Sequence, residues 1–427
     1  MDQDVPGAGE GEAPGPGHAV QLGMLSGALG RTLHGLQARV VAAAAILCAT
    51  VGVVAATPAG RHDGGAARAC GTVTIVAAGD VLLDRGVRKA IERGNTTAKN
   101  VTGGVDSGGG TAGVKALLSG VAGLFSEADI GLVNLECPAT TTAAPAAKRF
   151  VFRAEPEWLR PLKEAGISDL CLANNHTLDQ GPGGLGDTIE AALGADLGVV
   201  GAGHTFREAR APLVRRFGSG NGDAGITVAL LAYNLFPQEG VVFDPDRPWV
   251  CSFDPDTIRD EIEAACEAAG VVVVSFHWGK EFSGVPGPAQ VDLAHRACDW
   301  GAELVIGHHP HVMQGIEVYR PAGGTQDRTS LIAYSLGNFV FDQEGVRAGV
   351  VDTASTSETF VLKVEVGEAG LLRAEVIPVV IDNCSPVAAG GEDAAGILQR
   401  VATLSRAFGT SIAPDGLVMW PTRHDSR

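Results

Sequence analysis

Short apolar runs rich in β-branched residues alternate along this chain with segments whose apolar residues recur every three or four positions. The runs have the length of buried strands, and the segments have the period of amphipathic helices. The strand-like runs are Val73–Ala77, Ile130–Asn134, Asp169–Leu172, Ile226–Ala232, Val271–Phe276, Leu304–Ile306 and Leu331–Tyr334. The helix-like segments are Val114–Phe125, Glu157–Ala165, Leu185–Leu193, Pro255–Ala269 and Pro288–Trp300. This alternation predicts an α/β fold.

The C-terminal part of the chain predicts some antiparallel pairing as well. The apolar runs Thr359–Val366 and Leu371–Ile381 are separated only by a short link, Gly-Glu-Ala-Gly. A link of this length between two strands indicates a hairpin. We therefore expect part of the sheet to be antiparallel.

The chain divides into segments of different composition. Residues 1–39 are rich in Gly and Pro and predict a disordered cytoplasmic tail. Residues 40–59 hold no charge and approach the ~20 residues that cross a bilayer, so we expect a transmembrane anchor, with a cleaved signal or a buried helix as alternatives. A linker, 60–70, precedes one large domain, 71–412, and a C-terminal tail, 413–427. Because a single leading span usually serves export, we expect this domain outside the cell membrane, with cleavage and secretion as the alternative.

Nearly every predicted strand ends in a residue that can bind a metal or transfer a proton. These residues are Asp80, Glu136, Asn175, His176, His277, His308, His309, His311 and Asn338. In open α/β sheets, ligands bind at the carboxyl ends of the strands, so these side chains should converge on one rim. Each has an ordinary explanation when taken alone, such as a turn-forming Asp or a core histidine. Six strand ends of this kind, with three histidines in four residues, favour a site.

The ligand types indicate the class of metal. Asp, Glu, Asn and His form a mixed oxygen and nitrogen set, which suits Mn, Fe or Zn better than a thiolate site would. A carboxylate between two cations can bridge them ~3.5–4 Å apart, as two-metal hydrolases require. We therefore expect two divalent ions. Cys137 and Cys171 lie near the rim without a catalytic motif and are expected to be core residues.

The charge balance excludes one class of partner. The chain has 32 Lys and Arg against 49 Asp and Glu, a formal net charge of −17. Nucleic acid binding needs a basic surface, so no nucleic acid partner is expected.

The strand-end motifs together resemble the capsule-biosynthesis CapA family, the poly-γ-glutamate synthesis proteins. The matching stretches are Gly79-Asp80-Val81-Leu82-Leu83, Val133-Asn134-Leu135-Glu136, Phe152-Arg153-Ala154, Leu172-Ala173-Asn174-Asn175-His176, His277-Trp278-Gly279, Gly307-His308-His309-Pro310-His311-Val312 and Tyr334-Ser335-Leu336-Gly337-Asn338-Phe339. They occur in the family's order over roughly residues 71–382. The family resembles the calcineurin-like metallophosphoesterases, which implies a β-sandwich flanked by helices, an αββα arrangement.

The resemblance also implies roles for individual residues. It implies that Asp80 and His311 bind a first metal, that Glu136 bridges, that Asn175, His277 and His309 bind a second metal, and that His176 is the catalytic acid at the leaving group. One departure concerns the first block, where metallophosphoesterases usually carry Asp-x-His. Here Val81 and Leu82 follow the Asp, so the first metal lacks one imidazole.

Three functions follow from these expectations. The leading one is a metal-dependent, membrane-anchored protein of cell-surface poly-γ-glutamate assembly, in which the ions polarise a phosphoryl or amide carbonyl and activate water. The alternatives are a metallophosphoesterase acting on a phosphodiester or lipid-linked intermediate, and a non-catalytic subunit that binds or exports polymer within a synthase complex. An acidic domain repels an anionic polymer. Bound cations, Arg85 and Arg153 would supply the attraction, and Asn338 is a further expected substrate contact.

Overall fold

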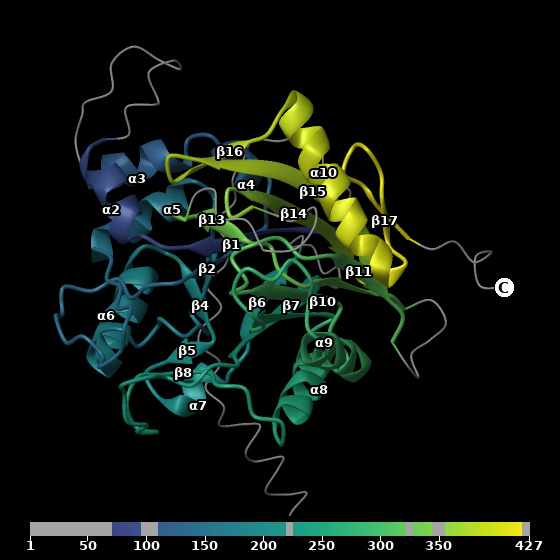
Figure 1. The fold of residues 1–427 in the computed structure, drawn as a ribbon. Helices are drawn as coiled ribbons and strands as arrows, with labels where there is room; N and C mark the ends of the chain where they lie inside the picture. Colours follow the sequence, from purple (N-terminus) through teal and green to yellow (C-terminus); the bar gives the residue numbers. More distant parts are fainter. Residues whose placement is uncertain (1–70, 95–109, 219–224, 322–327, 344–354, 421–427) are drawn as a thin grey trace, which may run out of the picture. The chain divides into compact units, whose positions relative to one another are not determined.

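The computed structural model describes residues 71–94, 110–218, 225–321, 328–343 and 355–420 (Figure 1). The predicted tail 1–39, span 40–59 and linker 60–70 lie outside these ranges. Within the described ranges, no helix combines the length and the apolar character that a membrane crossing requires.

The first sheet has a parallel half and an antiparallel half. Its strand order is β16-β15-β14-β1-β2-β3-β4, and β13 pairs with the end of β1. The parallel strands are β1 (Val73–Val81), β2 (Ile130–Leu135), β3 (Asp169–Cys171), β4 (Gly198–Val200) and β13 (Asn338–Val340). The antiparallel strands are β14 (Glu358–Gly367), β15 (Gly370–Asp382) and β16 (Ser385–Ala388). The predicted C-terminal hairpin is thereby confirmed as β14 and β15.

The second sheet is parallel at its centre and antiparallel at both edges. Its order is β11-β12-β10-β9-β7-β6. The strands are β6 (Leu213–Phe217), β7 (Ile226–Asn234), β9 (Val271–His277), β10 (Leu304–His308), β11 (Ile316–Tyr319) and β12 (Ser330–Ala333). All seven predicted runs of the parallel regions form strands, with ends that differ by a few residues from the prediction.

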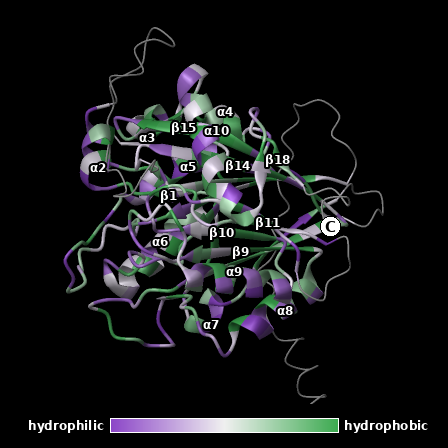
Figure 2. Cartoon of the chain, turned by 45° about the vertical axis from the view of Figure 1, so that its right-hand side comes forward, coloured by the Kyte–Doolittle hydropathy of each residue, from purple (hydrophilic) through white to green (hydrophobic). Residues whose placement is uncertain are grey.

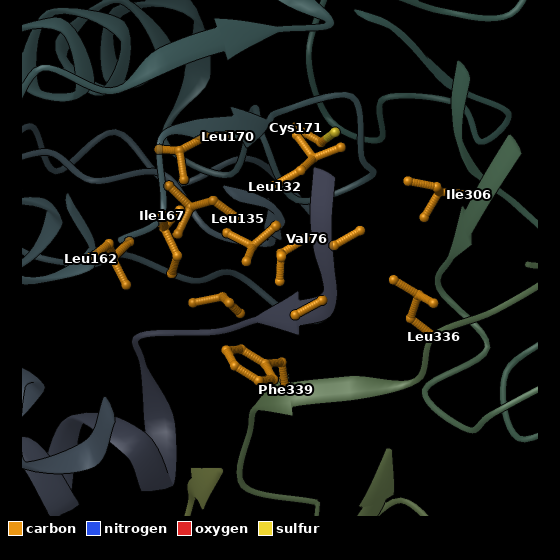
Figure 3. Packing of buried hydrophobic residues seen from close by; sticks show 14 of the residues in the cluster. Val76, Leu132, Leu135, Leu162, Ile167, Leu170, Cys171, Ile306, Leu336 and Phe339 are labelled. Atoms are coloured by element: carbon orange, nitrogen blue, oxygen red, sulfur yellow. The ribbon is translucent and has the colours of Figure 1, made fainter. Parts of the chain in front are cut away.

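The two sheets pack face to face because alternate residues of a strand point to opposite sides. In β7, Leu230 joins the core cluster that contains the first sheet, whereas its neighbour Leu231 joins a second cluster with the outer helices. Figure 3 shows labelled residues of the first of these cores, among them Ile306 of β10 and Leu132 of β2. Strands buried on both faces read as continuous apolar runs, as Val271–Phe276 does. The predicted α/β class is confirmed.

Helices cover the outer faces of the sheets. They are α2 (Arg85–Glu92), α3 (Thr111–Leu118), α4 (Ala122–Phe125), α5 (Arg160–Glu164), α6 (Gly181–Gly194), α7 (Phe206–Ala209), α8 (Ile258–Ala268), α9 (Pro288–Trp300) and α10 (Gly391–Ser405), with the 3-10 turns η2 (Pro156–Leu159) and η3 (Arg406–Phe408). Helices α8 and α9 pack on the second sheet through residues such as Ile262 and Ala297. Figure 2 shows strongly hydrophobic strands beside helices that carry both hydrophobic and hydrophilic residues.

Two predicted helices are interrupted. The segment Val114–Phe125 forms α3 and α4 instead of one helix, because Gly120 between them turns against β16 and accepts a hydrogen bond from the Ala388 N–H at 3.3 Å. The segment Glu157–Ala165 begins as η2 and becomes α5 only at its second half. Pro161, which has no N–H to donate, stands in the first turn of α5.

The fold extends beyond the predicted domain boundary at residue 412. Strand β17 (Ser411–Ile412) pairs with β18 (Val418–Met419), and Val418 is buried. The Val376 N–H also donates to the Gly416 carbonyl at 2.9 Å, which ties this hairpin to β15. Residues 413–420 therefore belong to the folded domain and not to the predicted tail. A second two-stranded pair joins β5 (Ala202–Gly203) to β8 (Trp249–Val250).

Candidate metal centre

The end of β1 places Asp80 at the centre of a buried polar cluster. Gly79 approaches β13 so closely that an added Cβ would meet the Gly337 carbonyl oxygen at 1.9 Å, and this approach puts Asn338 opposite Asp80. The Asp80 carboxylate accepts hydrogen bonds from Asn134 Nδ2 at 2.9 Å and His308 Nδ1 at 3.1 Å.

The charge state of Asp80 follows from these contacts. Burial by itself raises the pKa of the carboxyl, but the hydrogen bonds to His308 and His311 outweigh it and hold the pKa well below its usual range. The low pKa favours the anionic form of Asp80, which is the form that binds a metal.

The carboxylate of Glu136, directly after β2, has one oxygen near two histidines and one oxygen without a partner. Its Oε1 lies 3.6 Å from His277 Nε2 and 3.9 Å from His311 Nε2. Its Oε2 is buried and has no hydrogen-bond partner among the described residues. Burial, together with the nearby charge of Asp80, raises the pKa of Glu136 well above its ordinary value. An uncompensated carboxylate in this position is costly unless a cation joins it.

The loop after β10 holds its histidines in a strained backbone conformation. His309 has a φ of 94° and His311 a φ of 59°, in the left-handed region that side chains other than glycine rarely adopt. Such strain gathers at functional sites, where the surrounding structure fixes it. The His309 ring packs on Phe236 with centroids 4.1 Å apart, and its Nδ1 is buried without a described partner.

The two loop histidines have opposite charge states. Burial lowers the pKa of His309 to about 3, and the nearby charge of His311 adds to this. Burial also acts to lower the pKa of His311, but Glu136 and Asp80 outweigh it and raise the pKa to about 9. His311 Nδ1 further contacts Asn338 Oδ1 at 2.9 Å. Protonated His311 lies between the carboxylates of Asp80 and Glu136. Its positive charge acts there as the charge of a bound metal ion would.

His277, at the end of β9, connects this cluster to Asn175, in the segment that follows β3. Its Nε2 lies 2.9 Å from Asn175 Oδ1 and 3.6 Å from Glu136 Oε1. Burial lowers the pKa of His277 well below its ordinary value, so the ring is neutral and can serve as a ligand. Its Nδ1 is buried and, within the described ranges, has no hydrogen-bond partner.

These residues fit a divalent cation. Ligand atoms of Glu136, His309 and His311 all lie within 4.8 Å of one another, and all three side chains are buried. Four buried side-chain atoms without a described partner belong to this neighbourhood, from Glu136, His277, His308 and His309. Buried polar groups are normally paired, so a group of orphaned ligand atoms indicates a ligand that completes them. A mixed carboxylate and imidazole set suits Zn, Mn or Fe.

A comparison with protein families agrees with the motifs. Residues 74–343 match the model of the family described as "Bacterial capsule synthesis protein PGA_cap". The chain belongs to this PGA_cap family. The resemblance to the CapA proteins that the strand-end motifs indicate is thereby confirmed.

The matches between this chain and individual relatives cover different shares of each relative's length. The "Capsule biosynthesis protein CapA" of Bacillus anthracis is 34% identical over 56% of this chain and 54% of the relative, so the match spans about half of that protein. The "PGA biosynthesis protein CapA" of Bacillus subtilis is 30% identical over 72% of this chain and 71% of the relative. A "Probable polyglutamine synthesis accessory protein" of Mycobacterium tuberculosis is 27% identical over 68% of this chain and 76% of the relative.

Beside the metal ligands predicted for this PGA_cap member lies His176. Its Nδ1 contacts Asp179 Oδ2 at 2.8 Å, and its ring packs against Phe152 with centroids 4.3 Å apart. Burial lowers the pKa of His176, while Asp179 acts to raise it. The side chain keeps 13% of its surface exposed, more than the 1% of His277, so His176 is the more accessible of the two histidines.

The structure separates the two predicted substrate-binding arginines. Arg85 pairs with Asp342 and lies over the rings of Phe152 and Phe341, at 5.5 and 5.9 Å. Phe341 itself lies 4.9 Å from the His311 ring, which places Arg85 at the edge of the cluster. The Arg153 guanidinium is directed elsewhere: its described partners are Glu155 at 3.8 Å and the Thr141 carbonyl at 3.5 Å.

The candidate site of this PGA_cap member also includes residues to which the sequence analysis assigned no role. His308, Asp179 and Lys148 all contact predicted site residues: His308 contacts Asp80, Asp179 contacts His176, and Lys148 donates to the Asn175 carbonyl. The triple-histidine motif already contained a signal for His308, and the spacing after His176 one for Asp179. No local pattern marks Lys148. Cys137 and Cys171 are buried core residues, and burial raises the pKa of both thiols.

Proposed function

We propose that this chain is a metal-dependent protein of poly-γ-glutamate capsule biosynthesis. The observation that carries the proposal is the buried group of Glu136, His309 and His311 in a member of a capsule synthesis family. Among the described residues, Glu136 Oε2 and His309 Nδ1 of this group have no hydrogen-bond partner. The relatives named for capsule, PGA and polyglutamine synthesis support the polymer context. Because the match spans only part of the Bacillus anthracis relative, activity, substrate and partners all belong to the proposal.

The site residues would divide the chemistry between metal binding and proton transfer. As the resemblance implies, Asp80 and His311 would hold one divalent ion and Asn175, His277 and His309 a second, with Glu136 between them. The close grouping of Glu136, His309 and His311 supports this arrangement. A bound cation of this kind polarises a phosphoryl or carbonyl oxygen and lowers the pKa of bound water. His176 would exchange a proton with the leaving group while Asp179 holds its other ring nitrogen.

We place the domain at the cell membrane, together with a polymer and other proteins as partners. The uncharged residues 40–59 support a single membrane anchor with the domain outside, or a cleaved signal and secretion. The polymer is poly-γ-glutamate or a related anionic chain, and other synthase subunits are expected beside the membrane. Arg85, at the edge of the cluster, is the arginine better placed to attract such a chain, since Arg153 pairs with Glu155.

Metal analysis of the full chain tests the metal site. We expect the purified wild type to retain or take up divalent Mn, Fe or Zn, and His309→Ala to lose most of it. His295→Ala is the matched control, because His295 contacts Glu317, away from the candidate site. A wild type without affinity for any of these ions, or a His309→Ala chain with unchanged content, would falsify the metal proposal.

Polymer production by cells carrying the same variants separates the functions. The leading proposal predicts that His309→Ala and Glu136→Ala abolish surface polymer, whereas His295→Ala does not. Ligand variants that still support production would favour a non-catalytic binding or export subunit. Turnover of a generic phosphodiester that Glu136→Ala abolishes would favour a metallophosphoesterase.

A further inference from the structure

A long loop between β2 and η2 folds against the segment that carries Asn175 and His176. We call residues 140–153 the arm. Its base is closed where the Thr140 N–H donates to the Ala154 carbonyl at 3.0 Å and the Ala154 N–H donates to the Pro138 carbonyl at 2.8 Å. A loop closed in this way is held as a unit of its own, and the residues at its tip can be positioned accurately.

The arm is fastened to the segment that follows β3, residues 174–181, which carries Asn175 and His176. The Ala146 N–H donates to the Asp179 carbonyl at 2.8 Å, and the Gln180 side-chain Nε2 donates to the Phe152 carbonyl at 3.1 Å. These bonds place the arm directly against the two residues expected to bind metal and to transfer a proton.

Lys148 is the charged residue at the centre of this contact. Its side chain is only 7% exposed and forms an ion pair with Asp179, which is completely buried. The same Nζ donates to the main-chain carbonyl of Asn175 at 2.7 Å. Lys148 therefore contacts the backbone of a predicted metal ligand and the carboxylate beside His176 at the same time.

Asp179 connects this lysine to the histidine. Its Oδ2 accepts hydrogen bonds from His176 Nδ1 at 2.8 Å and from the Phe152 N–H at 2.7 Å. The hydrogen bond made by one ring nitrogen decides which nitrogen of a neutral imidazole carries the proton. A carboxylate on Nδ1 keeps the proton there and leaves Nε2 for the reacting group.

We propose that Asp179 and Lys148 are positioning residues of this site: Asp179 fixes the tautomer and orientation of His176, and Lys148 holds Asp179 and the Asn175 main chain in place. The inference rests on the proposed function for its chemical meaning, because it assigns His176 to proton transfer. Stability alone does not account for the pair, since a buried ion pair is often no more stabilising than apolar residues of similar volume. Here both charged groups also contact residues of the candidate site.

Nitrogen-15 NMR of the histidine rings tests this inference directly. The full chain is labelled at histidine and kept metal-free with EDTA near pH 8, where His176 is neutral because burial lowers its pKa. The His176 signals are assigned by their loss in His176→Gln. We expect wild-type His176 to be a single form with its proton on Nδ1, and Asp179→Ala to give a mixture of both tautomers.

Variants of the lysine test its part. Lys148→Met should also release His176 into a mixture, and Lys148→Arg should restore the single form. Arg149→Met is the matched control, because Arg149 lies over Phe150 and should leave His176 unchanged. In the Asp179→Ala background, Lys148→Met should change the His176 signals no further, since the lysine acts through the carboxylate.

The inference is overturned if wild-type His176 carries its proton on Nε2, or if Asp179→Ala keeps the wild-type form. It also fails for Lys148 if Lys148→Met keeps a single Nδ1–H form. Should Lys148→Met alone not fold, Lys148→Gln, which keeps a hydrogen-bond donor but not the charge, takes its place, and a single Nδ1–H form in that variant overturns the role of Lys148. Because no metal is present, these results stand apart from the metal proposal: a wild type that binds no ion but shows Nδ1–H keeps the positioning role.

Discussion

Two clusters of described residues contain a buried glutamate among histidine and aromatic side chains, but only the first has buried atoms without a hydrogen-bond partner. In the first, around Glu136, the Oε2 atom has no described partner. In the second, which we call the Glu317 cluster (His295, Glu317 and Tyr334), both carboxylate oxygens are engaged. His295 Nε2 lies 3.0 and 2.9 Å from them, and the Tyr334 hydroxyl donates at 2.6 Å.

The difference separates a structural cluster from a site built for a ligand. A buried carboxylate with all its hydrogen bonds made contributes to one fixed arrangement of the core. A buried carboxylate with an empty oxygen costs folding free energy, and something must compensate. The Glu136 neighbourhood, with its orphaned histidine nitrogens and left-handed backbone at His309 and His311, therefore has the properties of a binding site.

The largest expected effect is on cation binding. Glu136→Gln keeps the shape of the side chain and removes its charge, so we expect the affinity for Mn²⁺ or Zn²⁺ to fall more than about 100-fold, beyond the range seen for residues that merely support ligands. The metal-free chain should be no less stable, because burial raises the pKa of Glu136 and favours its neutral form there. Titration calorimetry measures the affinity, and Glu317→Gln is the matched control, which should keep wild-type binding. Equal losses of cation affinity in Glu136→Gln and Glu317→Gln would contradict the distinction between the two clusters.

In the Glu317 cluster we expect a smaller effect, which lowers the stability of the chain and not its cation affinity. Glu317→Ala leaves the Tyr334 hydroxyl and His295 without their acceptor, and we expect the free energy of unfolding to fall by about 2 kcal/mol. Urea unfolding measures this change, with cation affinity measured on the same sample. The distinction predicts unchanged affinity, and a cation affinity that falls together with stability would show that the two clusters are coupled.

The sequence predicted that these strand-end residues lie close together, for a topological reason. Asp80, Glu136 and His277 follow apolar runs, and parallel strands bring their carboxyl ends to one edge wherever they lie in the chain. The runs were recognisable because strands buried on both faces are apolar throughout. Even the antiparallel β14 and β15 were predictable from the short link between them.

Contacts that no periodic pattern encodes could not be predicted. Lys148 lies in an irregular loop, and its partners Asp179 and Asn175 are specified only by how the arm folds back. Helix α10 was missed because its buried residues, such as Ile397 and Val401, are confined to its second half, after a first turn of small and acidic residues. The boundary at 412 was wrong because the two-residue strands β17 and β18 are too short to show a period.

The third expected effect is the pH dependence of cation binding, which uses the charge of His311. Its pKa is raised to about 9 in the folded, metal-free chain, above the ordinary value near 6.5. The stability that protonated His311 provides to that chain is therefore complete below about pH 6.5 and disappears as the pH rises through 9. A cation must displace this proton, so its affinity should rise about tenfold per pH unit between roughly pH 6 and 8.

Proton release distinguishes this cause from a general effect of pH. Calorimetry in two buffers of different ionisation enthalpy should show about one proton released per cation bound, and more if Glu136, whose pKa burial raises, also gives up a proton. Glu317→Gln should keep the same release, because both Glu317 oxygens lie in the other cluster. Binding that releases no proton near pH 7 would show that the cation leaves the protonated His311 in place, and the ligand set would then have to exclude it.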